Sequence, residues 1–188
     1  MKLKGIDFIP KLKRLDFDTE IKPFESELKE FDDFLFDDAK NYLAQKLAVT
    51  YLLENEEKNE TIAYFCIAND CIRRETDKEK MTAAEKQIWN KINRKIPFLK
   101  QRGYYPSVKI GRLAVSKKYA GCGFGSIMID TVARMYMENE QKAGCRFISV
   151  DARIEVCDFY ERNGFRFLTD KDAGNNQRVM YFDLKAIA

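Results

Sequence analysis

The sequence contains no histidine among its 188 residues. Imidazole is required by Ser-His-Asp hydrolases, by Cys-His proteases and by histidine-ligated zinc sites, so its absence excludes these three classes. Any catalysis must use Tyr, Asp, Glu, Lys or Cys side chains, backbone groups, or a nucleophile that the substrate brings. We expect chemistry of this kind, and we expect no metal site.

The sequence also lacks an apolar run near the ~20 residues of a membrane-spanning helix. Residues 1–7 have a basic start, but they include no apolar core of roughly 7–15 residues and no small-residue cleavage site. The five cysteines are an odd number and include no C-x-x-C pair, which argues against a disulfide framework or a zinc ribbon. We therefore expect no membrane insertion, a cytoplasmic location and free thiols.

What is present is typical of a globular protein, with 45% hydrophobic and 34% charged residues. The length suits one domain with a proper core, so we expect a single domain over residues 1–188. The formal net charge of +3 is too small to indicate nucleic-acid binding by itself, although it permits an anionic ligand.

Hydrophobic periodicity predicts a mixed α/β order of elements. Residues 27–46 have helical spacing, and the β-branched and aromatic runs 48–54 and 62–68 predict a hairpin. The charged segment 75–94 reads as a surface helix. We expect further strands at 13–17, 109–115, 146–151, 165–168 and 179–184, and a short helix at 155–163. The sheet must then be mixed, with one crossover between the strands on either side of the helix that follows residue 125.

The motif with the most chemical content is Ala120-Gly121-Cys122-Gly123-Phe124-Gly125, which lies between a predicted strand and a predicted helix. Unpaired N–H groups and the positive end of the dipole at a helix start attract anions, and glycine lets the backbone approach them. A P-loop would need Lys-Ser or Lys-Thr after the glycines. A Rossmann fingerprint would need glycine at Ser126. Neither pattern is present, and a purely structural glycine turn remains an alternative.

The residues around this loop resemble a known family. Leu113-Ala114-Val115, then Tyr119 and the glycine loop up to Ser126, are similar to motif A of the GNAT family of N-acetyltransferases. Residues 158–165, DFYERNGF, resemble its motif B. The resemblance is specific over residues 109–168. It departs at Ala120, where the family usually has Arg or Gln, so a side-chain hold on the cofactor is lost there. Lys117, Lys118 or a backbone-only cradle would have to replace it.

The resemblance implies a GNAT-like single domain, with a central sheet that splays at the cofactor cleft and is flanked by helices. It implies acetyl-CoA as cofactor and transfer of the acetyl group to a primary amine by direct attack. The implied cofactor-binding residues are Leu113, Ala114, Val115, Ala120, Gly121, Cys122, Gly123, Phe124, Gly125, Ser126 and Tyr160.

Tyr160 is also the implied catalytic residue, as the acid for the departing thiolate, because a phenol with a reference pKa near ~10 stays protonated at neutral pH. A packing role for its ring is the alternative. No general base can be named, although Asp151 and Glu155 are expected near the cleft.

Within the family, residues 31–35 and 111–115 resemble the branch of bacterial toxins that acetylate aminoacyl-tRNA and that pair with a ribbon-helix-helix antitoxin. The charged segment 75–94 departs from that branch. Three functions therefore stay open: an N-acetyltransferase for a small molecule or protein, a toxin that acts on charged tRNA, and a non-catalytic CoA-binding sensor. The acceptor is not readable from the sequence, and a homodimer is open as well.

Overall fold

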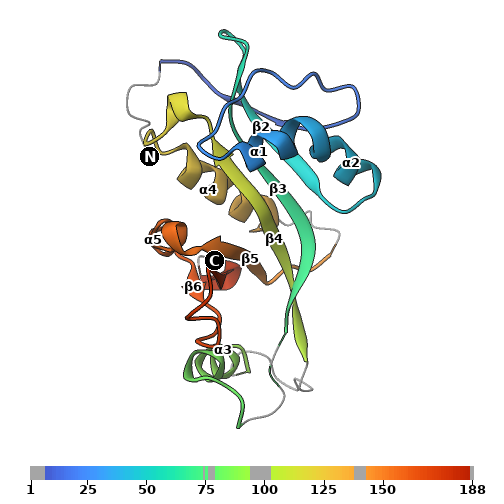
Figure 1. Cartoon of the computed structure of the whole chain (residues 1–188). Coiled ribbons are helices and arrows are strands. Elements are labelled where there is room, and N and C mark those ends of the chain that lie inside the picture. The colour runs from blue at the N-terminus through green and yellow to red at the C-terminus, as the bar shows by residue number, and fades with distance from the viewer. Residues whose placement is uncertain (1–6, 74, 76–78, 94–102, 138–142, 187–188) are drawn as a thin grey trace. The chain divides into compact units, whose positions relative to one another are not determined.

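The computed structural model describes residues 7–73, 75, 79–93, 103–137 and 143–186 (Figure 1). The chain forms two compact units. Unit 1 comprises Met1–Ala68 and Ile110–Met135, and unit 2 comprises Asn69–Lys109 and Tyr136–Ala188. Each unit is thus assembled from two separate stretches of the sequence.

The strands form a seven-stranded sheet in the order β1-β2-β3-β4-β5-β7-β6. Its pairs are antiparallel for β1 with β2, β2 with β3, β5 with β7 and β6 with β7. Strand β4 (Tyr104–Val115) and β5 (Phe147–Arg153) are parallel. A parallel pair needs a crossover, and α4 (Phe124–Met137) lies in that connection. The predicted mixed sheet with one crossover is confirmed.

Unit 1 contains β1 (Lys11–Arg14), β2 (Val49–Asn55) and the first part of β3 (Glu60–Arg73). The predicted hairpin is confirmed, because β2 and β3 pair from Val49↔Ile67 to Asn55↔Glu60. Residues Ile62 to Ile67 are buried without interruption. Such a continuous apolar run is typical of a strand that is covered on both faces.

The helical segment of unit 1 consists of α1 (Lys29–Asp33), the π-helix η1 (Phe34–Asp38) and α2 (Ala39–Ala44). The sequence predicted one continuous helix over 27–46. The position of this helix is confirmed, but a π-turn interrupts it. In this turn the N–H of Ala39 bonds to the carbonyl of Phe34, five residues back. This wider turn allows both Phe34 and Ala39 to be buried in the same core. The core also contains Leu15, Phe24, Leu35, Ala48, Leu52, Tyr64, Cys66 and Ala114.

Unit 2 holds the remaining elements. They are α3 (Ala83–Asn93), the first part of β4, β5, the 3-10 turn η3 (Ile154–Val156), α5 (Cys157–Arg162), β6 (Arg166–Phe167), β7 (Gln177–Asp183) and the 3-10 turn η4 (Leu184–Ala186). The strand and helix positions predicted for 146–184 are confirmed within a few residues. Within the predicted segment 75–94, residues 76–78 and 94 lie outside the described residues, and so does the preceding residue 74.

Helix α3 differs from the prediction of a surface helix. Trp89 is 1% exposed, and its ring stacks on that of Tyr105 with centroids 5.0 Å apart. Ile88 and Met81 are buried in the same cluster, together with Phe147 and Tyr181. The sequence shows apolar residues such as Met81 and Ile88 at helical spacing, and the many charges between them favoured a solvated helix over an edge of the sheet. In the structure, α3 is instead part of the core of unit 2.

Two general predictions can be compared with the described residues. All five cysteines are free thiols, as expected. No helix within the described ranges combines the length and the apolar character that a membrane crossing requires.

Candidate functional site

The glycine loop connects β4 to α4 within unit 1. Strand β4 ends at Val115, and the N–H of Ser116 bonds to the carbonyl of Ile62 on β3 at 2.8 Å. The 3-10 turn η2 (Lys117–Tyr119) follows. The backbone then takes φ values of 75° at Gly121 and 95° at Gly123 before α4 begins. Residues with a side chain rarely adopt such values, so the turn favours glycine at both positions.

The loop presents unpaired backbone donors. The N–H of Cys122 bonds to the carbonyl of Tyr119 at 3.3 Å, and that of Ile127 bonds to Gly123 at 3.2 Å. Within the described part of the chain, the N–H groups of Phe124, Gly125 and Ser126 have no acceptor. They form the start of a 14-residue helix, where the dipole adds positive potential. This arrangement suits an anionic group such as a pyrophosphate.

All ten predicted binding residues from Leu113 to Ser126 lie together at the end of β4 and the start of α4. Two of them have side chains that belong to the core: Ala114 is 6% exposed and Phe124 is fully buried. These two can offer only their backbone to a ligand. Gly121 is exposed, and a Cβ added there would meet no atom within 4 Å. Cofactor binding by this set stays a prediction.

The two lysines before the loop are engaged by carboxylates. Lys117 Nζ lies 2.6 Å from Glu25 Oε1, and Lys118 Nζ lies 2.6 Å from Glu60 Oε2. Hydrogen bonds to these carboxylates raise the pKa of both lysines. The sequence offered either lysine as a replacement for the missing side chain at Ala120. Their ion pairs favour the other alternative, a cradle made of backbone N–H groups.

The two segments that carry the resemblance to the toxin branch contact each other in unit 1. The guanidinium of Arg112 on β4 lies 3.9 Å from the ring centroid of Phe34 in η1 and 6.0 Å from that of Tyr42 in α2. Beneath them, the Tyr64 hydroxyl donates to the carbonyl of Phe31 at 2.8 Å. Burial raises the pKa of Tyr64. The π-turn is thus fastened to the strand that leads into the loop, and π-turns are frequent at functional sites.

Tyr160 lies in unit 2, near the end of α5. It is 7% exposed, and its ring packs edge-on against Phe159 and Phe165 at centroid distances of 5.1 and 5.2 Å. Burial raises the pKa of Tyr160 to about 12. No residue in the described ranges hydrogen-bonds to its hydroxyl. The ring therefore packs, as the alternative reading expected, and the hydroxyl remains a protonated donor at neutral pH.

Helix α5 ends at a residue in the left-handed conformation. Gly164 has a φ of 87°, and its N–H bonds to the carbonyl of Glu161 at 2.9 Å. The N–H of Phe165 returns to the carbonyl of Tyr160 at 3.0 Å. A Cβ at Gly164 would lie 2.9 Å from Phe182 Cε2. Glycine is therefore required at this position by conformation and by space.

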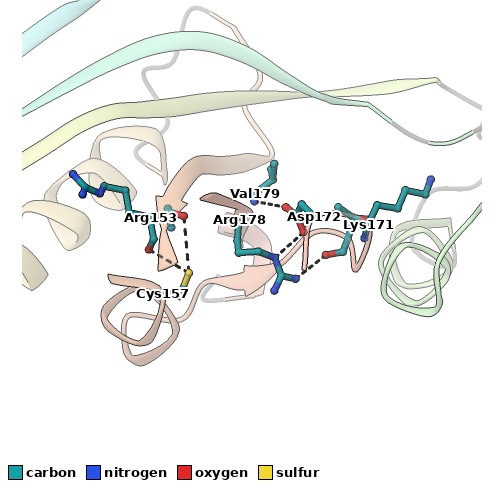
Figure 2. A network of polar contacts seen from close by, with 8 residues as sticks. Arg153, Cys157, Lys171, Asp172, Arg178 and Val179 are labelled. Atoms are coloured by element: carbon teal, nitrogen blue, oxygen red, sulfur yellow. Dashed lines mark hydrogen bonds and ion pairs between the residues drawn. The ribbon is translucent and has the colours of Figure 1, made fainter. Parts of the chain in front are cut away.

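Polar contacts fix the surroundings of α5 in unit 2 (Figure 2). Asp172, 8% exposed, accepts hydrogen bonds at 2.7 Å from Arg178 Nε and from the Val179 N–H. The Cys157 thiol, at the first residue of α5, lies 3.4 Å from the carbonyl of Arg153 at the end of β5. These contacts hold the turn before β7 and tie the start of α5 to β5.

The acids expected near the cleft are both paired with cations in unit 2. Asp151 forms an ion pair with Lys109 on β4, and Glu155 lies 3.6 Å from Arg153. Among the described residues, no group of three or more Cys, Asp or Glu side chains is placed to hold a metal ion. The splay of the sheet that the resemblance implies stays a prediction.

Sequence reasoning missed Glu60, which contacts both Lys118 and Tyr119. It also missed Tyr119 itself, which it used only as a spacer before the loop. An aromatic residue directly before a glycine-rich turn was the available signal, because such a turn needs an anchor. Glu60 lies about 60 residues earlier in the chain, where no sequence pattern relates it to the loop.

Comparison with known proteins places these observations in a family. Residues 56–167, more than half of the chain, match the family model described as an acetyltransferase (GNAT) domain. The sequence matches none of the curated proteins with which it was compared.

Several solved structures share the fold. A tyrosine-to-phenylalanine mutant of KacT has a TM-score of 0.73 and 22% identity, over 95% of this chain and 96% of that one. AtaT complexed with acetyl-methionyl-tRNAfMet has a TM-score of 0.74 and 21% identity, over 95% of this chain and 97% of that one. AtaTR bound with AcCoA has a TM-score of 0.70 and 22% identity, over 95% of each chain. The likeness extends over nearly the full length of each.

Proposed function

The chain belongs to the GNAT family of acetyltransferases, and from this premise we propose that it transfers an acetyl group from acetyl-CoA to the amino group of an aminoacyl-tRNA. One observation carries the choice of acceptor. The fold matches AtaT complexed with acetyl-methionyl-tRNAfMet over 95% of this chain and 97% of that one. The contact of Arg112 with Phe34, which joins the two toxin-like segments, supports the same choice.

The residues of this chain have separate tasks in such a reaction. Acetyl-CoA, when bound, supplies an activated thioester. The backbone N–H groups of Gly125 and Ser126 would hold its pyrophosphate at the start of α4. Leu113 and Val115 would offer backbone groups to its pantetheine arm, and an N–H near Val115 would favour negative charge on the carbonyl oxygen. Single-residue roles of this kind follow from the family resemblance.

The acceptor amine attacks in its neutral form, so that the C–N bond forms, the C–S bond breaks and the amine proton ends on sulfur. Tyr160 donates a hydrogen bond to the departing sulfur. With a pKa of about 12, the phenol is a weaker acid than a thiol, whose reference pKa is about 8.5. Full transfer of its proton is therefore uphill, and Tyr160 acts mainly by hydrogen bonding and regains any proton it gives.

The same proposal includes a protein partner. AtaT has been solved bound to the C-terminus of the antitoxin AtaR, and KacTA in complex with DNA. By analogy we assign this chain a DNA-binding antitoxin of the ribbon-helix-helix type, a cytoplasmic location and a single acetyltransferase domain over residues 1–188. A homodimer is compatible with these assignments.

Inducible expression of the chain alone tests the proposal. We expect growth arrest together with N-acetylated aminoacyl-tRNA, detected by mass spectrometry of the aminoacyl-adenosine released by nuclease. Expression of Tyr160→Phe at the same level is the matched control, and it should arrest growth more weakly. Unimpaired growth without acetylated tRNA would contradict the toxin assignment. Turnover with small amines would then identify the small-molecule alternative, and acetyl-CoA binding without turnover would identify the sensor.

A further inference from the structure

We propose that Glu60 is a positioning residue for the glycine loop and that it acts through Tyr119. The inference rests on the proposed function, because it assumes that acetyl-CoA binds at that loop. All of the residues involved belong to unit 1, and the effect travels from β3 through one tyrosine to the backbone of the loop.

Tyr119 contacts the loop in two ways. Its carbonyl accepts the N–H of Cys122 at 3.3 Å, which closes the turn over Gly121. Its ring packs edge-on against Phe124, the first residue of α4, with centroids 5.6 Å apart. Phe8 covers the ring at 5.9 Å, and Tyr119 is 5% exposed. Tyr119 therefore contacts both ends of the loop segment that precedes α4.

Glu60 fixes the far end of this tyrosine. The Tyr119 hydroxyl donates to Glu60 Oε1, and Glu60 is the first residue of β3, paired with Asn55 across the hairpin. A hydrogen bond to a charged acceptor is about twice as strong as a neutral one. The hydroxyl end of Tyr119 is thus anchored to the sheet.

The second carboxylate oxygen of Glu60 accepts Lys118 Nζ at 2.6 Å. Burial alone would raise the pKa of Glu60, but the hydrogen bonds from Lys118 and Tyr119 hold it below the ordinary value. Glu60 is therefore ionised at neutral pH. Lys118 neutralises its charge, which prevents the carboxylate from repelling an anion at the neighbouring loop. This gives Lys118 a function other than direct contact with the cofactor.

The physical need for such an anchor follows from the glycines. Glycine loses more conformational freedom on ordering than any other residue. If the loop were not held in advance, that entropy would be lost when the ligand binds, and affinity would fall. Loss of the Glu60–Tyr119 contact should therefore weaken the binding of the group that sits on the loop, and leave the binding of the pantetheine arm unchanged.

Two variants test this in the full-length protein. Tyr119→Phe removes only the hydroxyl and keeps the rings packed, and Glu60→Gln keeps the size of the side chain and removes its charge. For each, we expect the calorimetric Kd for CoA to rise about tenfold, the size of effect that 1.4 kcal/mol produces. Pantetheine, which lacks the pyrophosphate, should change by less than about twofold in ligand-observed NMR. Both variants lose the charge-assisted hydrogen bond between Tyr119 and Glu60, and Glu60→Gln also loses the ion pair with Lys118. The double variant should therefore bind CoA about as weakly as Glu60→Gln alone.

Hydrogen exchange gives a readout that a merely structural role would not move. The amide of Cys122 should exchange faster in both variants, while the amides of β2 and β3 stay protected. Tyr51→Phe is the matched control, since it also removes a hydroxyl from a stacked ring of unit 1 that has no contact with the loop. Its affinity for CoA should equal that of the wild type.

Equal weakening of CoA and pantetheine would overturn the inference, and so would unchanged CoA affinity in both variants. Either result would leave the proposed function intact if the wild type binds CoA. Failure of the wild type to bind CoA in the first titration would instead overturn the proposed function, and this inference with it.

Discussion

At the scale of single residues, Tyr160 combines a packed ring with a free hydroxyl. Replacement by phenylalanine keeps the edge-on contacts with Phe159 and Phe165 and removes the donor. If the hydroxyl serves the departing sulfur, the loss belongs to the transition state, so kcat should fall by roughly 10²-fold while KM changes little. Steady-state kinetics of Tyr160→Phe and wild type, at equal melting temperatures, measures this. A kcat within about twofold of wild type would end the case for Tyr160 as the acid.

The buried phenol of Tyr160 also links stability to pH. Burial raises its pKa to about 12, above a value of about 10 in the unfolded chain, so the folded state holds its proton more tightly. The contribution to stability is complete below about pH 10 and is lost as the pH rises toward 12. This difference in pKa corresponds to a stability contribution on the order of 3 kcal/mol.

Urea denaturation at pH 8, 10 and 11 tests this linkage. Wild type should lose more free energy of unfolding between pH 8 and 11 than Tyr160→Phe does, because the variant has no phenol to ionise at this position. Tyr64 and Tyr181, whose pKa values burial also raises, are present in both proteins and cancel in the comparison. Tyr104→Phe, which alters an exposed ring, is the control and should behave as wild type. Identical pH profiles for wild type and Tyr160→Phe would contradict the assignment.

At the scale of elements, the start of α4 offers a test of anion binding. Gly121 has a positive φ and open space around its Cα. Asn and Asp have the same shape and both tolerate this conformation better than other residues. Gly121→Asp should therefore weaken CoA binding at least tenfold more than Gly121→Asn does, because it alone adds a negative charge beside the pyrophosphate.

The difference between the two variants should shrink as salt is added, since the interaction is between exposed charges. Calorimetric titration at about 50 and 500 mM salt measures both effects. Equal affinities of Gly121→Asp and Gly121→Asn at low salt would remove this loop from the binding site.

Most elements could be predicted because their signals are local. The runs at 48–54 and 62–68 are rich in β-branched and aromatic residues, and Asn163-Gly164 marks the end of α5 directly. The π-turn at Phe34–Asp38 could not be predicted, because it depends on how Phe34 and Ala39 share a core with Tyr64 and Arg112 from other strands. The burial of Trp89 likewise depends on Tyr105, whose contact with it is tertiary.

The candidate site was predictable to a similar degree. The glycine loop can be recognised directly in the sequence, and the structure adds that Gly121 and Gly123, but not Gly125, have a positive φ. The partners of the charged side chains could not be predicted, because ion pairs such as Lys118–Glu60 join residues that are far apart in the sequence. Only the fold decides which acid a lysine meets.

At the scale of the whole molecule, the two units are drawn from interleaved stretches of sequence, and strands β3 and β4 contribute residues to both. If residues 1–188 form a single domain, as we propose, the units should unfold in one cooperative step. Scanning calorimetry should then give equal calorimetric and van't Hoff enthalpies. A van't Hoff enthalpy near half of the calorimetric value would show instead that the units melt independently.

The burial of Trp89 has a practical consequence. It is the one tryptophan of the chain, and its indole is shielded from water by the core of unit 2. Its fluorescence should therefore be emitted at short wavelength in the native protein and shift to the red when this core opens. Tyrosines lie in both units, for example Tyr64 in unit 1 and Tyr181 in unit 2, so only the tryptophan signal is specific to one unit. The protein thus carries an intrinsic optical reporter for half of its structure, with no label attached.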